Sequence, residues 1–113
     1  METWILIVLV VGFLAWRMMP TKGVQSISTA QLKHVLNDKD KVFIDVRTPA
    51  EYKGRNIPQF KNIPLGSGFN QLPKDKEIVV ICQSGMRSGQ ACKQLKKLGY
   101  ARVTNVRGGM SAY

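Results

Sequence analysis

The sequence predicts an α/β domain with a mainly parallel five-stranded sheet and helices on both faces, preceded by one transmembrane helix. Short apolar runs rich in β-branched residues alternate with segments of helical spacing, which is the order of elements in a parallel sheet. A separate apolar segment stands at the start of the chain. We therefore expect three parts: an anchor helix over residues 1–19, a linker over 20–23 and the α/β domain over 24–113.

The N-terminal segment has the features of a membrane anchor. Residues 4–16 carry no charge, and a helix over residues 1–19 would be about 28 Å long, close to the roughly 30 Å of a bilayer core. Trp4 and Trp16 stand where an aromatic belt is expected. A cleaved signal peptide would carry Lys or Arg before the apolar run, where this chain has Glu2. A single-pass anchor is thus favoured over a signal peptide and over a buried core helix.

The chain is strongly basic, with 17 Lys and Arg against 7 Asp and Glu and a formal charge of +10. This balance indicates an anionic neighbour. A membrane surface together with an anionic substrate is favoured over nucleic acid, because the sequence has no RNA-binding aromatic motif, zinc-ligand spacing or basic recognition helix. Arg17, Lys22 and Lys33 all follow the apolar segment, so the positive-inside rule places the N-terminus outside the cell membrane and the C-terminal domain in the cytoplasm.

The domain begins with a short strand predicted over residues 24–27. Ser28 and Gln31 follow with the spacing of a capping box, in which each side chain bonds the backbone N–H of the other residue. Apolar residues at helical spacing then predict a first helix of about ten residues. The apolar run 42–44 predicts a strand that is buried on both faces.

A second capping box follows that strand. Thr48 and Glu51 have the same spacing, and Pro49 stands at the first helical position, so a short helix is predicted here. Glu51 is therefore interpreted as a capping residue. One short strand is expected near residues 61–63, before a polar connection that contains Gly and Pro.

The last predicted elements surround a cysteine. A strand over residues 77–81 leads into a small polar loop, and a helix over 87–98 follows and ends at Gly99. Residues 103–106 predict the final strand, before two glycines.

Cys82 stands at the carboxyl end of a strand, where parallel sheets place their ligand sites. Loop N–H groups, the positive end of the following helix and the charge of Arg87 favour its thiolate, which is the nucleophilic form. Cys92 is interpreted as a core residue of that helix rather than a resolving thiol. Roughly 15 Å along a helix separates the two cysteines, too far for a disulfide, so both are expected to be free, as in a reducing compartment.

Several motifs in order resemble a single-domain rhodanese over roughly residues 24–113. They are Asp45-Val46-Arg47-Thr48-Pro49-Ala50-Glu51-Tyr52, Asn56-Ile57-Pro58, Asn62-Ile63-Pro64-Leu65, Cys82-Gln83-Ser84-Gly85-Met86-Arg87-Ser88, Leu98-Gly99-Tyr100 and Gly108-Gly109-Met110. The resemblance implies the rhodanese-like α/β fold and a rhodanese-type sulfurtransferase. In that family a cysteine takes sulfane sulfur from thiosulfate or a persulfide and passes it to a thiophilic acceptor.

Carried over by position, the resemblance makes Cys82 the catalytic nucleophile and persulfide carrier. Asp45 and Arg47 would support the loop through hydrogen bonds. No metal and no cofactor are implied. The expected partners are a small sulfur-donor anion, a thiophilic acceptor, the membrane through residues 1–19, and a protein donor or acceptor. The substrate would be bound by the loop residues Gln83, Ser84, Gly85, Met86, Arg87 and Ser88.

Two other functions stay open at this point. Related phosphatases and arsenate reductases have five residues between the cysteine and the arginine, whereas four separate Cys82 from Arg87, the length that the family associates with sulfur. The other alternative is a non-catalytic rhodanese-like binding module at the membrane.

Two positions depart from the family pattern. Gln83 stands where rhodaneses with good thiosulfate activity often carry a second cation, so thiosulfate is expected to bind weakly. Asn56 and Gln59 replace the usual histidine and glycine of their motif. His34, the only histidine, is far from the loop in sequence and is interpreted as a surface residue.

Overall fold

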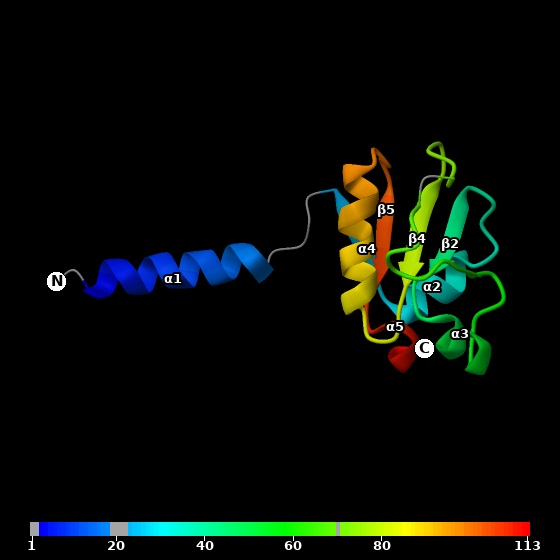
Figure 1. Ribbon diagram of the computed structural model, residues 1–113, viewed down its shortest axis with the longest axis horizontal. Coiled ribbons are helices and arrows are strands. Elements are labelled where there is room, and N and C mark those ends of the chain that lie inside the picture. Colours follow the sequence, from blue (N-terminus) through cyan, green and yellow to red (C-terminus); the bar gives the residue numbers. More distant parts are fainter. Residues whose placement is uncertain (1–2, 19–22, 70) are drawn as a thin grey trace.

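The structure is a computed structural model that describes residues 3–18, 23–69 and 71–113. Most of the predicted linker over 20–23 lies outside these ranges. The chain forms an elongated N-terminal helix followed by an α/β domain (Figure 1).

Five parallel strands form one sheet in the order β1-β5-β4-β2-β3. The strands are β1 (Val24–Ile27), β2 (Lys41–Asp45), β3 (Lys61–Asn62), β4 (Glu77–Ile81) and β5 (Val103–Val106). The predicted parallel five-stranded sheet is thus confirmed. β4 lies at the centre of the sheet and its residue Ile81 pairs with Asp45 of β2, so both strands end at the same edge.

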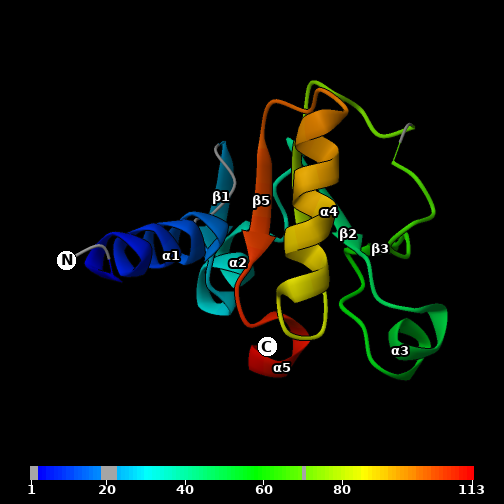
Figure 2. The ribbon, with the colours of Figure 1, turned by 60° about the vertical axis from the view of Figure 1, so that its left-hand side comes forward.

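Helices cover both faces of the sheet, as predicted. They are α2 (Thr29–Val35), α3 (Pro49–Gly54), α4 (Met86–Lys97) and α5 (Gly109–Ala112). Figures 1 and 2 show α4 on one face, with α2 behind the sheet. The side chains of β4 divide between the two faces. Ile78 and Val80 pack in one core cluster with Leu95 of α4, whereas Val79 and Ile81 pack in the other with Leu32 of α2.

Both predicted capping boxes are present. The Ser28 side chain accepts a hydrogen bond from the N–H of Gln31 at the start of α2, and Thr48 does the same with Glu51 at the start of α3. Helix α2 has 7 residues rather than about ten, because the chain turns after Val35 to enter β2.

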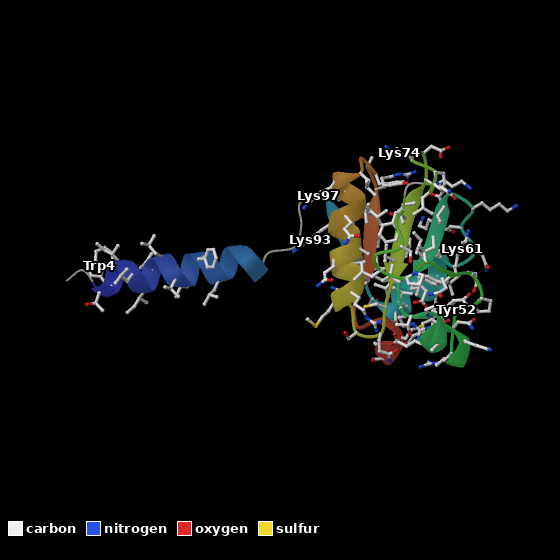
Figure 3. The ribbon with its side chains drawn as sticks, in the orientation of Figure 1. Trp4, Tyr52, Lys61, Lys74, Lys93 and Lys97 are labelled. Atoms are coloured by element: carbon white, nitrogen blue, oxygen red, sulfur yellow. The ribbon has the colours of Figure 1, made fainter. Side chains whose placement is uncertain are left out.

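The N-terminal helix α1 spans Thr3–Met18, 16 residues. At 1.5 Å per residue it is about 24 Å long, against a bilayer core of about 30 Å. Within residues 3–18, 23–69 and 71–113, no helix is long and apolar enough to cross a membrane. The transmembrane helix predicted over residues 1–19 is therefore not supported. The apolar side chains from Trp4 to Leu14 are exposed, and Figure 3 shows them around a helix that stands apart from the domain.

Candidate functional site

The loop after β4 is folded around the sulfur of Cys82. Gly85 caps α4 with a φ of 102°, in the left-handed region that glycine adopts without strain. Its N–H donates to Cys82 Sγ at 2.9 Å. The hydroxyl of Ser88, in the first turn of α4, lies 3.3 Å from the same sulfur. The short loop and the helix start therefore direct their donors at one atom, as the sequence predicts.

These donors lower the pKa of the Cys82 thiol. Burial of the sulfur opposes ionisation, but the thiolate accepts hydrogen bonds from the side chain and the backbone of Ser88. The backbone N–H groups of Gly85 and Ser84 lower the pKa further. Cys92 differs, because burial and the nearby charge of Cys82 raise its pKa to about 12. Cys82 is thus the thiol that ionises, and Cys92 is a protonated core residue.

Replacing Ser88 with alanine is expected to shift the alkylation of Cys82 to higher pH. The variant loses a hydrogen bond to the thiolate, so the pKa of the Cys82 thiol rises and less thiolate is present at neutral pH. Hydrogen bonds to charged groups contribute roughly 1.5–3 kcal/mol, but the hydroxyl proton is shared with Asn105 Oδ1, so the rate with iodoacetamide at neutral pH should fall about 3-fold to 10-fold. The rate is measured across the pH range in which the wild-type thiol titrates.

Ser84→Ala is the matched control for that measurement. Ser84 contributes its backbone N–H, which alanine keeps, so its pH profile should stay at the wild-type position. Equal profiles for Ser88→Ala and the wild type would show that the Ser88 hydroxyl does not act on the thiolate.

A side chain from the neighbouring strand completes this arrangement. Asn105 Oδ1 lies 2.5 Å from the Ser88 hydroxyl, whose single proton is shared between this oxygen and Cys82 Sγ, and Asn105 Nδ2 donates to the Gly85 carbonyl at 3.4 Å. Asn105 thus ties the loop to β5. Asn105 was not among the predicted site residues. The available signal was a polar residue within an otherwise buried strand, and the pairing of Asn105 with Val80 of β4 gives it its place below the loop.

The C-terminal helix α5, which was not predicted, supports the loop from behind. The N–H groups of Met110 and Ser111 donate to the carbonyls of Cys82 at 2.8 Å and Gln83 at 2.9 Å. Gly109 has a φ of 55°, and a Cβ at this position would collide with the Cys82 carbonyl. Glycine therefore allows the close approach that leaves the loop N–H groups free to face the sulfur.

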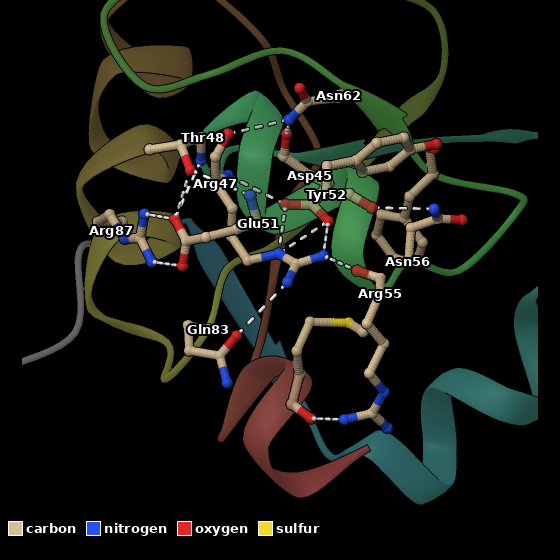
Figure 4. A network of polar contacts seen from close by, with 12 residues as sticks. Asp45, Arg47, Thr48, Glu51, Tyr52, Arg55, Asn56, Asn62, Gln83 and Arg87 are labelled. Atoms are coloured by element: carbon tan, nitrogen blue, oxygen red, sulfur yellow. Dashed lines mark hydrogen bonds and ion pairs between the residues drawn. The ribbon is translucent and has the colours of Figure 1, made fainter.

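Asp45 and Arg47 form a buried ion pair beneath the loop (Figure 4). Arg47 Nη2 and Nε lie 2.8 Å and 3.1 Å from Asp45 Oδ2. The same guanidinium donates to the Arg55 carbonyl at the end of α3 and to Gln83 Oε1 at 3.4 Å. The pair thus joins β2, α3 and the loop.

Gln83 takes part in this support rather than facing the sulfur. Its Oε1 accepts from Arg47, and its Nε2 donates to Ser111 Oγ at 3.1 Å. The side chain predicted to bind substrate is therefore engaged with the residues behind the loop.

Arg87 points to α3. Its Nη1 and Nη2 donate to Glu51 Oε1 at 2.7 Å and Oε2 at 2.9 Å, and both side chains are about one-third exposed (Figure 4). The capping role predicted for Glu51 is present, whereas its ion pair with Arg87 was not predicted.

Exposed acidic residues are unevenly distributed between the two ends of the sheet. The exposed carboxylates of Asp38, Asp40 and Asp75 lie near the starts of β2 and β4, at the end of the sheet away from Cys82. At the Cys82 end, the described acidic residues are Asp45 and Glu51, each paired with an arginine. This end also carries the exposed basic residues Lys53, Arg55 and Arg107. The opposite end also carries exposed basic residues, among them Lys39, Lys74 and Arg102, so the two ends differ in their acidic residues rather than in the sign of their charge.

The remaining candidate positions lie away from the loop. His34 is exposed on α2, and Asn56 Nδ2 donates to the Tyr52 carbonyl at 2.9 Å. Within the part of the chain that the structure describes, no group of three or more His, Cys, Asp or Glu residues could hold a metal ion.

Comparison with known proteins agrees with this geometry. A profile of the rhodanese-like domain matches residues 28–113. The chain belongs to the rhodanese-like family. A sulfurtransferase of Allochromatium vinosum is 39% identical over 94 residues, which cover 80% of this chain and 88% of the relative. A putative sulfurtransferase of Bacillus subtilis is 44% identical over 94 residues, which cover 80% of this chain and 90% of the relative.

Solved structures show the same rhodanese-like fold. A rhodanese-like domain protein of Staphylococcus aureus is 35% identical with a TM-score of 0.70, and the match covers 78% of this chain and 89% of that one. The human single-domain sulfurtransferase TSTD1 is 25% identical with a TM-score of 0.68, over 78% of this chain and 93% of that one. These relatives support sulfur transfer as the general chemistry of the family.

Proposed function

We propose that this chain is a sulfurtransferase that carries sulfane sulfur as a persulfide on Cys82. The observation that carries the proposal is the Cys82 sulfur, which meets the Gly85 N–H at 2.9 Å and the Ser88 hydroxyl at 3.3 Å and whose pKa is lowered by them. A sulfur held in this way is a nucleophile at neutral pH without a general base.

Loading begins when the Cys82 thiolate attacks the outer sulfur of a donor such as thiosulfate. A new S–S bond forms, the bond between the two donor sulfurs breaks, and sulfite leaves with the electron pair. The negative charge then rests on the outer sulfur of the persulfide. The loop N–H groups and the positive end of α4 stabilise that anion.

In the second half of the reaction the persulfide on Cys82 is the sulfur donor and the acceptor is the nucleophile. A thiophilic acceptor, such as cyanide or a thiolate, attacks the outer sulfur, and the S–S bond to Cys82 breaks to return the thiolate. The Cys82 residue is buried, so the rim of the loop must move to admit either reactant. Met86, 77% exposed, lies on that rim. A putative sulfur carrier protein of Bacillus subtilis is 40% identical over 77 residues, which cover 66% of this chain and 42% of that protein, and this likeness supports a protein as sulfur acceptor or donor.

The test uses the full chain purified in detergent. The protein is incubated with thiosulfate or a small persulfide and then with cyanide. We expect thiocyanate, and before cyanide is added we expect the mass of one sulfur atom on the peptide that contains Cys82. Neither signal with any donor would refute the proposal. Release of phosphate from an aryl phosphate would favour the phosphatase alternative, which the four residues between Cys82 and Arg87 oppose.

We also propose that the N-terminal segment attaches the domain to a membrane. The exposed side chains of α1 from Trp4 to Leu14 are almost all apolar, a surface that lipid can cover. We expect the full chain in the membrane fraction and a variant that lacks residues 1–22 in the supernatant. Reporter fusions at each end test the predicted cytoplasmic position of the domain, and equal fractionation of the two proteins would refute attachment through this segment.

A further inference from the structure

The chain contains two capping boxes that differ in one respect. At α2, Gln31 Oε1 accepts the Ser28 N–H at 2.9 Å, and at α3, Glu51 Oε1 accepts the Thr48 N–H at 3.1 Å. The neutral amide of Gln31 therefore makes the same capping hydrogen bond to the backbone as the Glu51 carboxylate does. The negative charge of Glu51 is not needed for the cap.

That charge is engaged with Arg87 instead. Both oxygens of Glu51 accept from the two terminal nitrogens of Arg87, at 2.7 Å and 2.9 Å, in a bidentate pair. The guanidinium, followed by the Thr48 backbone, lowers the pKa of Glu51 to about 2, so the carboxylate is fully ionised at neutral pH. Arg87 lies directly after the Cys82 loop, in the first turn of α4, but brings no net charge to the loop while this pair is formed.

The second arginine near the loop is neutralised in the same way. Arg47 is buried against Asp45, and its remaining donors bond to Arg55 and Gln83. An anion that enters the loop therefore meets N–H groups and two arginines whose charges are cancelled by Glu51 and Asp45. The attraction that an uncancelled Arg87 would exert scales with the charge of the anion.

We propose that Glu51 sets the donor selectivity of the Cys82 site, because it holds Arg87 and cancels its charge and so disfavours doubly charged sulfur donors relative to singly charged ones. The inference rests on the proposed sulfurtransferase function. Thiosulfate and methanethiosulfonate isolate the effect of charge, since the first is a dianion and the second a monoanion. In both reactions the Cys82 thiolate takes the outer sulfur, and sulfite or methanesulfinate leaves with the electron pair.

The test is Glu51→Gln in the full chain. Glutamine keeps the oxygen that caps α3 and removes the charge that holds Arg87. We expect the ratio of kcat/KM for thiosulfate to kcat/KM for methanethiosulfonate to rise about 2-fold to 5-fold at low salt, the size of a partly exposed charge effect, and the gain to shrink at high salt. An unchanged ratio, or equal changes for both donors, would overturn the inference.

Two further variants make the result specific. Gln31→Glu introduces the same charge into the matched cap of α2, and its donor ratio should equal that of the wild type. The double variant Glu51→Gln with Arg87→Gln should lose the gain, because the gain needs a free Arg87 charge. A donor ratio that rises in the double variant as well would assign the effect to something other than Arg87.

The failure of this inference can be separated from the failure of the proposed function. If the wild type takes sulfur from neither donor, the sulfurtransferase proposal fails. If the wild type is loaded by both donors and the ratio stays constant in Glu51→Gln, only the role of Glu51 fails. A melting temperature of Glu51→Gln far below that of the wild type would also overturn the inference, since Glu51 would then act only by holding the fold together.

Discussion

Cys82→Ser is expected to abolish sulfur loading and thiocyanate formation, a loss of about 1,000-fold or more. The hydrogen bonds that lower the pKa of the Cys82 thiol cannot ionise a serine hydroxyl at neutral pH, and serine cannot form an S–S bond. The smaller oxygen can still accept the N–H of Gly85, so the loop should keep its fold. Intact-protein mass and thiocyanate release measure the loss, and circular dichroism verifies folding.

Cys92→Ala is the matched control for this prediction. Cys92 is buried on the inner face of α4, and its pKa of about 12 leaves the thiol protonated. The alanine variant should lose some stability through a small cavity but keep sulfur loading. Sulfur found on Cys92 in the Cys82→Ser protein would contradict the assignment of the carrier.

Much of the fold could be predicted because its signals are local. The segments Glu77–Ile81 and Val103–Val106 match β4 and β5 residue for residue. In β4 the signal is four consecutive apolar residues, as a strand buried on both faces requires, whereas in β5 it is the β-branched residues Val103, Thr104 and Val106. The two capping boxes were predicted from residues three positions apart, which form their hydrogen bonds within one turn. Helix α5 escaped prediction because its 4 residues are held by contacts with the distant loop.

The candidate site was predictable as a location but not as a network. Strand order places Cys82 and Asp45 at the same edge, and Gly85 marks the turn that brings an N–H to the sulfur. The partners of long side chains depend on contacts across the fold. Arg87 reaches Glu51, 36 positions away in sequence, and Ser88 reaches Asn105, 17 positions away. No local pattern specifies either pair.

For the N-terminal helix, the secondary structure was predicted correctly but the membrane-spanning role was not supported. Its apolar pattern was sufficient to predict a helix, and α1 forms over Thr3–Met18. The membrane-spanning interpretation depended on a helix over residues 1–19, and the observed 16 residues fall short of that length. A helix can be predicted from residue type, whereas its function as a membrane span depends on where it ends.

Arg47→Ala is expected to have the largest effect on stability. Arg47 and Asp45 are 2% and 0% exposed, so the variant leaves a carboxylate buried without its cation. Breaking a buried pair in this way costs about 3–5 kcal/mol, out of the roughly 5–15 kcal/mol that stabilise a domain of this kind. The free energy of unfolding, measured by urea denaturation, should fall by this amount. Sulfur loading should fall as well, because Gln83 loses a hydrogen-bond donor from beneath the loop.

The double variant Asp45→Asn with Arg47→Met distinguishes the buried charge from the loss of packing. It removes both charges and keeps side chains of similar volume, so it should be more stable than Arg47→Ala even though it contains more substitutions. Glu51→Gln breaks an ion pair that is one-third exposed, where water can solvate the released guanidinium, so its unfolding curve should stay near that of the wild type. A double variant as unstable as Arg47→Ala would show that the hydrogen bonds from Arg47 to Arg55 and Gln83, rather than the neutralised charge, hold β2, α3 and the loop together.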